Sequence, residues 1–379
     1  MALTTGHAAP YRPPSDEVVL ERLPPALLAL RQLRGTATAS TEPANLDAAL
    51  AAARHYVELG QTYSDPRAYG YAQAALGHWW TSDDGATPQL LVMRARILQF
   101  GHRFPQALAQ LEVALKADQF QPDAWLLFAS IEEVEGNLPA ARAGCMKVLP
   151  MADPLIGATC VAGIGALSGR ADAAEQLLAQ ALARPNAADK AVQTWSWTTL
   201  AEIRARRNDT LGAETAFRKA LAVEPDDVYA RSAYADLLID ADRVAEARRV
   251  LGDAMQADAL LLRAAIAAQR NNDADASALR ADLAQRFSEA RARGDETHLR
   301  EQARFVLAVE HDAARALDLA QRNFNVQREP ADVRILLEAA LAAGDPEAAK
   351  PALEWMKTTA IDSVQLSTLA KKIADGARG

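Results

Sequence analysis

The sequence predicts an all-α protein that folds as a right-handed superhelical α-solenoid of stacked antiparallel helix hairpins. One observation is a repeat: the phrase Trp197-Thr-Thr-Leu200-Ala201 recurs in thinner form every thirty-odd residues, a period typical of helical hairpin arrays. Apolar residues and a proline follow it at fixed offsets, as Ala213, Phe217, Ala220 and Pro225. The other observation is composition, because half of the residues are hydrophobic and alanine exceeds isoleucine and valine, which favours closely packed helices.

The N-terminal part is predicted to differ from the rest. Residues 1–14 are expected to form an extended arm, because three prolines disfavour a helix there. Residues 15–87 are expected to hold N-terminal capping helices and a first, divergent hairpin. Within it, Asp65 and Pro66 cap and start a helix that ends near Trp79.

Three further regions complete the predicted array. Residues 88–258 carry the regular repeats, in which large and small apolar residues recur at helical spacing. Residues 259–360 are divergent helical repeats, and their register is ambiguous up to residue 290 because that stretch is so rich in alanine. Residues 361–379 are expected to form a C-terminal capping helix and tail.

The quoted residues resemble the tetratricopeptide repeat, whose first helix carries Trp, Leu, a small residue and Tyr, and whose second carries Ala, Phe and Ala before a Pro. The match covers roughly residues 45–360 and is strongest in the units around Trp125 and Trp197. Small residues such as Ala201 and Ala213 let the two helices of a hairpin approach closely. The resemblance implies an α-solenoid and a non-enzymatic scaffold or adaptor that binds a protein or peptide.

The resemblance also implies where a partner would bind. In the family the concave face is lined by first-helix positions that stay outside the hairpin core. Here these positions hold Val92, Met93, Arg96, Phe100, Leu126, Leu127, Ser130, Val134, Ile156, Trp195, Glu202, Arg206, Tyr229 and Asp236. Because a large exposed apolar patch marks an interaction site, we expect a groove that binds a segment with apolar side chains.

Two alternatives remain open at this stage. The groove could be filled by the chain's own N-terminal arm, which carries Tyr11 and Val18 among its prolines, and the protein would then be an envelope assembly or structural factor. A carbohydrate-binding module or an enzyme has less support. Trp79 and Trp80 could stack on a sugar, but packing between the first two hairpins explains them better.

Tests for chemistry give no catalytic or metal site. The segment Gly163-Ile-Gly165-Ala-Leu-Ser-Gly169 lacks the Lys-Ser/Thr of a phosphate loop. The six histidines never pair with a cysteine at metal-ligand spacing, and no serine or cysteine nucleophile signature occurs. We therefore expect no enzymatic activity, no cofactor, no metal and no small-molecule ligand.

The charge pattern bears on partners as well. The net charge is −8, and Lys and Arg are interleaved with Asp and Glu instead of forming the basic face that nucleic acid requires. No apolar run approaches the roughly 18 residues that a membrane-spanning helix needs. We therefore expect a soluble chain whose partner is neither nucleic acid nor a membrane interior. The sequence does not predict the oligomeric state.

The compartment and the redox state of the two cysteines are linked questions. Cys145 and Cys160 fall on a second helix and on the first helix of the next unit, so they could form a disulfide across that joint or remain buried thiols. A disulfide would indicate an oxidising compartment. The polar, Pro-containing start shows no export signal, but it suits a chain whose signal has been removed, so export is slightly favoured over the cytoplasm.

Overall fold

The computed structural model describes residue 15 and residues 45–63, 66–185, 188–253, 257–292 and 294–376. Within these residues the chain is all α-helical and contains no strand, which confirms the predicted fold class. The predicted arm at 1–14 and the capping helices expected before residue 45 lie outside the described residues, apart from Ser15.

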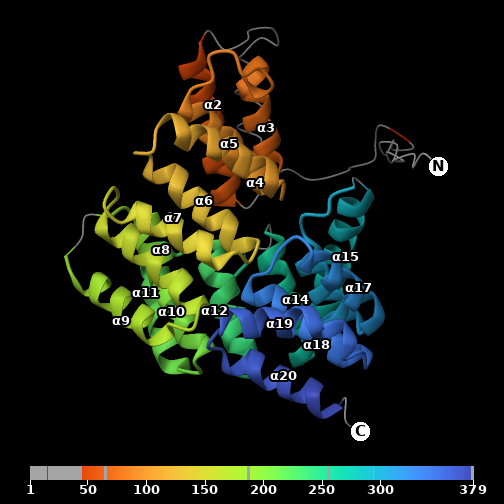
Figure 1. Ribbon diagram of the computed structural model, residues 1–379. Coiled ribbons are helices and arrows are strands. Elements are labelled where there is room, and N and C mark those ends of the chain that lie inside the picture. Colours follow the sequence, from red (N-terminus) through yellow and green to blue (C-terminus); the bar gives the residue numbers. More distant parts are fainter. Residues whose placement is uncertain are drawn as a thin grey trace.

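The helices follow one another as antiparallel pairs from α2 and α3 to α18 and α19, with α20 after the last pair (Figure 1). The first half comprises α2 (Leu46–Tyr63), α3 (Arg67–Leu76), α4 (Pro88–Phe100), α5 (Phe104–Ala117), α6 (Pro122–Val134), α7 (Leu138–Val148), α8 (Pro154–Leu167), α9 (Ala171–Ala183), α10 (Lys190–Arg206) and α11 (Thr210–Val223). The second half comprises α12 (Val228–Asp240), α13 (Val244–Leu251), α14 (Asp258–Asn271), α15 (Ala276–Ala292), α16 (Leu299–Phe305), α17 (Ala313–Phe324), α18 (Pro330–Ala343), α19 (Lys350–Thr359) and α20 (Val364–Gly376).

Local sequence signals explain where many of these helices begin. Proline occupies the first helical position of α4, α6, α8 and α18, where its missing N–H is not needed. Aspartate side chains cap α10, α11 and α12 by accepting hydrogen bonds from backbone amides, the residues being Asp189, Asp209 and Asp227. These signals recur with the repeat, so hairpin after hairpin starts in the same register.

The divergent repeats contain an irregularity that the sequence pattern does not predict. Helix α16 continues into one π-helical turn, Val306–Glu310, and ends at His311 in the left-handed conformation. Val306 and Val309 of this turn are buried in the main core, so the turn packs in spite of its unusual hydrogen bonding. The Ala-rich helix α14 before it is buried over most of its length.

The last helices of the solenoid return to its middle. The backbone amide of Arg328, between α17 and α18, donates to the carbonyl of Val134 at the end of α6 at 2.7 Å. Arg334 of α18 and Gln365 of α20 both bind Asp240 at the end of α12, and Arg207 after α10 pairs with Asp362 at 3.4 Å. Figure 1 shows the blue helices α18–α20 beside the green α12. These contacts lie at the turns between the first and second helices of the middle hairpins.

Gly136 makes one of these contacts close. It sits in the turn between α6 and α7 with φ 82°, a conformation that favours glycine. A Cβ atom there would lie 3.1 Å from Cβ of Arg328 and 3.1 Å from Nε1 of Trp355 in α19. Glycine is therefore favoured at position 136 for two reasons: the positive φ of the turn and the close approach of Arg328 and Trp355.

We expect Gly136→Ala to cost more stability than Gly252→Ala, which serves as the control. Gly252 has φ 60° but nothing within 4 Å of a Cβ, so its replacement should cost only the backbone term of about 1 kcal/mol. Gly136→Ala should cost roughly 1–2 kcal/mol more because it pushes on α19. Urea unfolding measures both, and hydrogen exchange should rise in α18 and α19 only for Gly136→Ala. Equal losses in the two variants would contradict the contact.

Candidate functional site

The candidate site is the inner face of the solenoid, which we define as the side of α6, α8, α10 and α12 that is turned toward α14, α16 and α18. On α10 this face carries Trp195 and Glu202, and on α12 it carries Tyr229 and Asp236. Each pair is seven residues apart and so lies on one side of its helix. The two pairs are 34 residues apart, which places them at equivalent positions of successive repeats.

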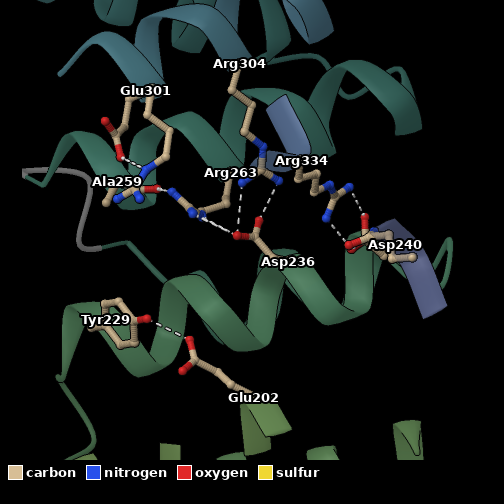
Figure 2. Close-up of polar contacts among 11 residues, drawn as sticks. Glu202, Tyr229, Asp236, Asp240, Ala259, Arg263, Glu301, Arg304 and Arg334 are labelled. Carbon is tan, nitrogen blue, oxygen red and sulfur yellow. Dashed lines mark hydrogen bonds and ion pairs between the residues drawn. The ribbon is translucent and has the colours of Figure 1, made fainter. Parts of the chain in front are cut away.

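A hydrogen bond joins the two helices on this face. The hydroxyl of Tyr229 donates to the Glu202 carboxylate at 2.6 Å, and Figure 2 shows the two side chains pointing toward one another. Tyr229 is nevertheless 61 % exposed and Trp195 is 37 % exposed. The bond therefore fixes the orientation of an aromatic ring whose surface remains open to a partner.

Asp236 is the centre of a partly buried ion-pair network. Arg263 of α14 and Arg304 of α16 both bind its carboxylate, at 2.7 Å and 2.6 Å (Figure 2). Burial opposes the charge of Asp236, but the two guanidinium groups outweigh burial and hold its pKa well below the usual range. One carboxylate thus ties three first helices together across the inner face.

A second network surrounds Arg300 of α16. Its guanidinium donates to Glu329 at 2.8 Å and to Asp332 at 3.3 Å, two residues that form the capping box of α18. Burial opposes the charge of the neighbouring Glu301, but Arg300 lowers its pKa to about 2. Burial acts more strongly on Asp332, which has no exposed surface, and raises its pKa.

Two other carboxylates on the inner face have no such compensation. Burial, and after it the charges of Glu329 and Glu202, raise the pKa of Glu133 on α6 to about 8, and Arg206 only partly opposes them. Burial also raises the pKa of Glu202, against Arg206 and the hydrogen bond from Tyr229. This part of the face therefore carries an excess of acidic groups.

Three of the sequence-predicted groove residues are not available on the surface. Val92, Met93 and Leu127 are only 7–8 % exposed and belong to the hydrophobic cores between the first hairpins. These side chains pack into cores that are shared by neighbouring hairpins, so the expected continuous apolar stripe does not extend along α4 and α6.

The other predicted residues are spread over several environments. Phe100 stacks on Tyr69 with 3.5 Å between ring centroids and lines a separate hollow of about 270 Å³, and Ser130 accepts a hydrogen bond from Gln99 at 3.2 Å. The remaining half-buried members are Arg96, Leu126, Val134, Ile156, Glu202, Arg206 and Asp236. Of the fourteen, Glu202 interacts with Tyr229 and Arg206, while Trp195 and Asp236 lie two helical turns along α10 and α12 from Glu202 and Tyr229.

The sequence reasoning missed the groups that face these residues from the C-terminal repeats. They are Arg263, Arg300, Glu301, Arg304, Glu329 and Arg334, together with Glu133 on α6. Glu133 could have been found, because it lies seven residues after Leu126 on the same helix face. The arginines could not, because the repeat register fades in the Ala-rich stretch that contains Arg263 and precedes the others.

Cys145 of α7 and Cys160 of α8 form a disulfide, with 5.4 Å between their Cα atoms. Both residues are buried in the main core, so the bond crosses the joint between two hairpins out of contact with solvent. Trp79 and Trp80 pack against the cores of the first hairpins, and the carbonyl of Trp79 accepts a hydrogen bond from the buried Arg94 at 2.8 Å.

Metal sites and membrane-spanning helices were considered among the described residues. Among the described residues no three histidine, cysteine or acidic side chains gather in a way that could hold a metal ion. No described helix is both long and apolar enough to cross a membrane.

Comparison with known proteins agrees with the repeat register. Residues 163–281 match the tetratricopeptide repeat model, which supports the resemblance of the chain to that repeat. No curated protein sequence matches the chain. Similar solved structures include the type IV pilus biogenesis factor PilW (19 % identity, 55 % of this chain and 96 % of that one, TM-score 0.43). Others are PilF of Pseudomonas aeruginosa (18 %, 55 % and 95 %, 0.40) and a tetratricopeptide repeat protein of Parabacteroides merdae (12 %, 76 % and 98 %, 0.41).

We expect Asp236→Asn to destabilise the fold, because it leaves Arg263 and Arg304 close together without a counter-charge. The loss should be about 2 kcal/mol, since the Asp236 side chain is 21 % exposed and water partly screens the pair. Asp226→Asn is the matched control: Asp226 also pairs with an arginine, but it is 93 % exposed and should change stability by less than about 0.5 kcal/mol. Urea unfolding at neutral pH compares them, and similar values would show that the network is not structural.

Proposed function

We propose that the protein is a non-enzymatic interaction scaffold that binds a peptide or protein segment along the inner face of α8, α10 and α12. A tetratricopeptide fold supports a role as a protein-interaction scaffold in general. The observation that supports this particular surface is the pair Trp195 and Tyr229, exposed by 37 % and 61 % at equivalent positions of successive repeats.

Exposed aromatic side chains in such an arrangement are suited to anchoring a partner. Trp and Tyr supply large contact areas and are enriched at the energetic centres of interfaces. The hydrogen bond to Glu202 already orients Tyr229, so binding would lose less side-chain entropy there. The half-buried Ile156 on α8 extends the apolar surface by one more first helix.

The proposed site is shorter than the groove inferred from the sequence. Toward the N-terminus, Val92, Met93 and Leu127 are covered, and the carbonyl of Val134 is already bonded to Arg328. Beyond α12 the face is occupied by the ion pairs of Asp236 and Asp240. A bound segment would therefore contact mainly three first helices.

The second candidate is an envelope assembly or structural factor. The observation in its favour is that α18–α20 bind the turns of the chain's own middle hairpins, so that part of the solenoid is already occupied from within. Filling by the N-terminal arm concerns residues outside those that the structure describes and stays a prediction.

The test is affinity capture with a Trp195→Ala/Tyr229→Ala variant. We expect partners retained by the wild-type protein to bind roughly 10–100-fold more weakly, because two aromatic anchors are lost. Val113→Ala/Leu211→Ala is the control, since these side chains are 55 % and 79 % exposed on second helices. Leu127 is unsuitable for this test because it is buried. An identical set of partners for both variants would rule out the proposed face.

We also propose that the protein works in an oxidising compartment, as expected for an exported chain. The buried Cys145–Cys160 disulfide supports this proposal, because such bonds persist where thiols are not continually reduced. The protein is isolated from its source with a thiol-blocking reagent present from lysis onward and during denaturation. Neither Cys145 nor Cys160 should then carry the blocking group. Two blocked cysteines would contradict it.

A further inference from the structure

The acidic groups around Trp195 and Tyr229 differ from the other carboxylates of the inner face. Asp236 and Asp240 are each held by arginines at 2.6–2.7 Å. Glu202 accepts the bond from Tyr229 but makes no ion pair within the described chain, and the carboxylate of Glu133 makes neither a hydrogen bond nor an ion pair there. These two carboxylates are therefore the ones with unused capacity for a positive partner.

The electrostatic surroundings agree with this assignment. Glu133 is faced by Glu329 from the start of α18 and by Glu202 and Arg206 from α10. Arg300 is engaged by Glu329 and Asp332, so Arg300 and Arg206 together offset only part of the effect of burial on Glu202. Burial and the neighbouring acidic groups raise the pKa of both Glu133 and Glu202, and a cation placed beside these carboxyls would favour their ionised forms and pair with them.

A second, independent observation concerns two hydroxyl groups on the same helix faces. Thr198 is 3 % exposed and Ser232 is 5 % exposed, and neither hydroxyl has a hydrogen-bond partner. Thr198 lies three residues after Trp195 and four before Glu202, and Ser232 has the same relation to Tyr229 and Asp236. Buried polar groups are normally satisfied, so two unpartnered hydroxyls at equivalent positions of successive repeats set this part of α10 and α12 apart.

Resting on the proposed function, we infer that the segment bound at α10 and α12 presents a lysine or arginine next to apolar side chains. The cation would lie between the carboxylates of Glu133 and Glu202, and the apolar neighbours would pack on Trp195 and Tyr229. A cationic head near aromatic faces gains further attraction from their π-systems.

The experiment selects ligands from a phage-displayed library of random 12-residue peptides on the full-length protein. Clones that bind the wild type and fail to bind Trp195→Ala/Tyr229→Ala are the inner-face binders. We expect these clones to be enriched in Lys or Arg beside Leu, Ile, Val or an aromatic residue. Synthetic peptides from them should then lose about ten-fold in affinity when the lysine is acetylated, because acetylation removes the charge.

Two glutamine variants assign the effect to named residues. Glu133→Gln/Glu202→Gln should weaken the lysine peptides about ten-fold while leaving their acetylated forms unchanged, and it keeps an acceptor for Tyr229. Glu112→Gln/Glu347→Gln removes the same charge from side chains that are 67 % and 74 % exposed and should change neither affinity. Circular dichroism verifies that all variants are folded.

The outcomes separate the two claims. Aromatic-dependent clones without enrichment in basic residues, or an equal affinity of acetylated peptides, would overturn the basic-segment inference while the inner-face scaffold stands. If no clone depends on Trp195 and Tyr229, both are overturned.

Discussion

Asp236 binds Arg263 and Arg304, and through this one carboxylate α12, α14 and α16 are held at fixed distances from each other. In a repeat array each hairpin normally touches only its neighbours, so curvature accumulates from small, independent steps. A shared ion-pair centre removes part of that freedom, because moving any one of the three helices would leave a partly buried charge uncompensated. The position of the inner face, including Tyr229 on the same side of α12, follows from this constraint.

The inner face divides its polar groups into two kinds. Around Asp236, Asp240 and Arg300 the charges compensate one another, and these groups connect helices. Around Glu133, Glu202 and Tyr229 they do not, and these groups lie beside exposed aromatic surface. Structural ion pairs and recognition groups thus occupy adjacent stretches of one surface, and only the second kind has anything to offer a partner.

The repeat phrase at Trp197 was enough to predict the all-α solenoid, because its period specifies hairpins and its small residues specify how closely they pack. The same register placed Trp195, Glu202, Tyr229 and Asp236 on one face. It misplaced Val92 and Leu127, because helical spacing identifies an apolar face without telling which neighbouring helix covers it. It also gave no sign of Arg304 opposite Asp236, since a contact between residues 68 positions apart is a product of superhelical curvature and leaves no local pattern.

The return of α18–α20 to Asp240 and to the turn at Gly136 has a consequence for how the chain is made. The hairpins from α6 to α13 emerge from the ribosome well before the residues that later bind their turns, since Arg334 follows Asp240 by 94 positions and Gln365 follows it by 125. During synthesis these middle repeats can fold against one another, but their turn edges stay uncovered until α20 has been translated. The contacts of the middle turns are therefore completed only by the last segment of the chain. Chains that end before this segment would expose surfaces that are covered in the complete solenoid.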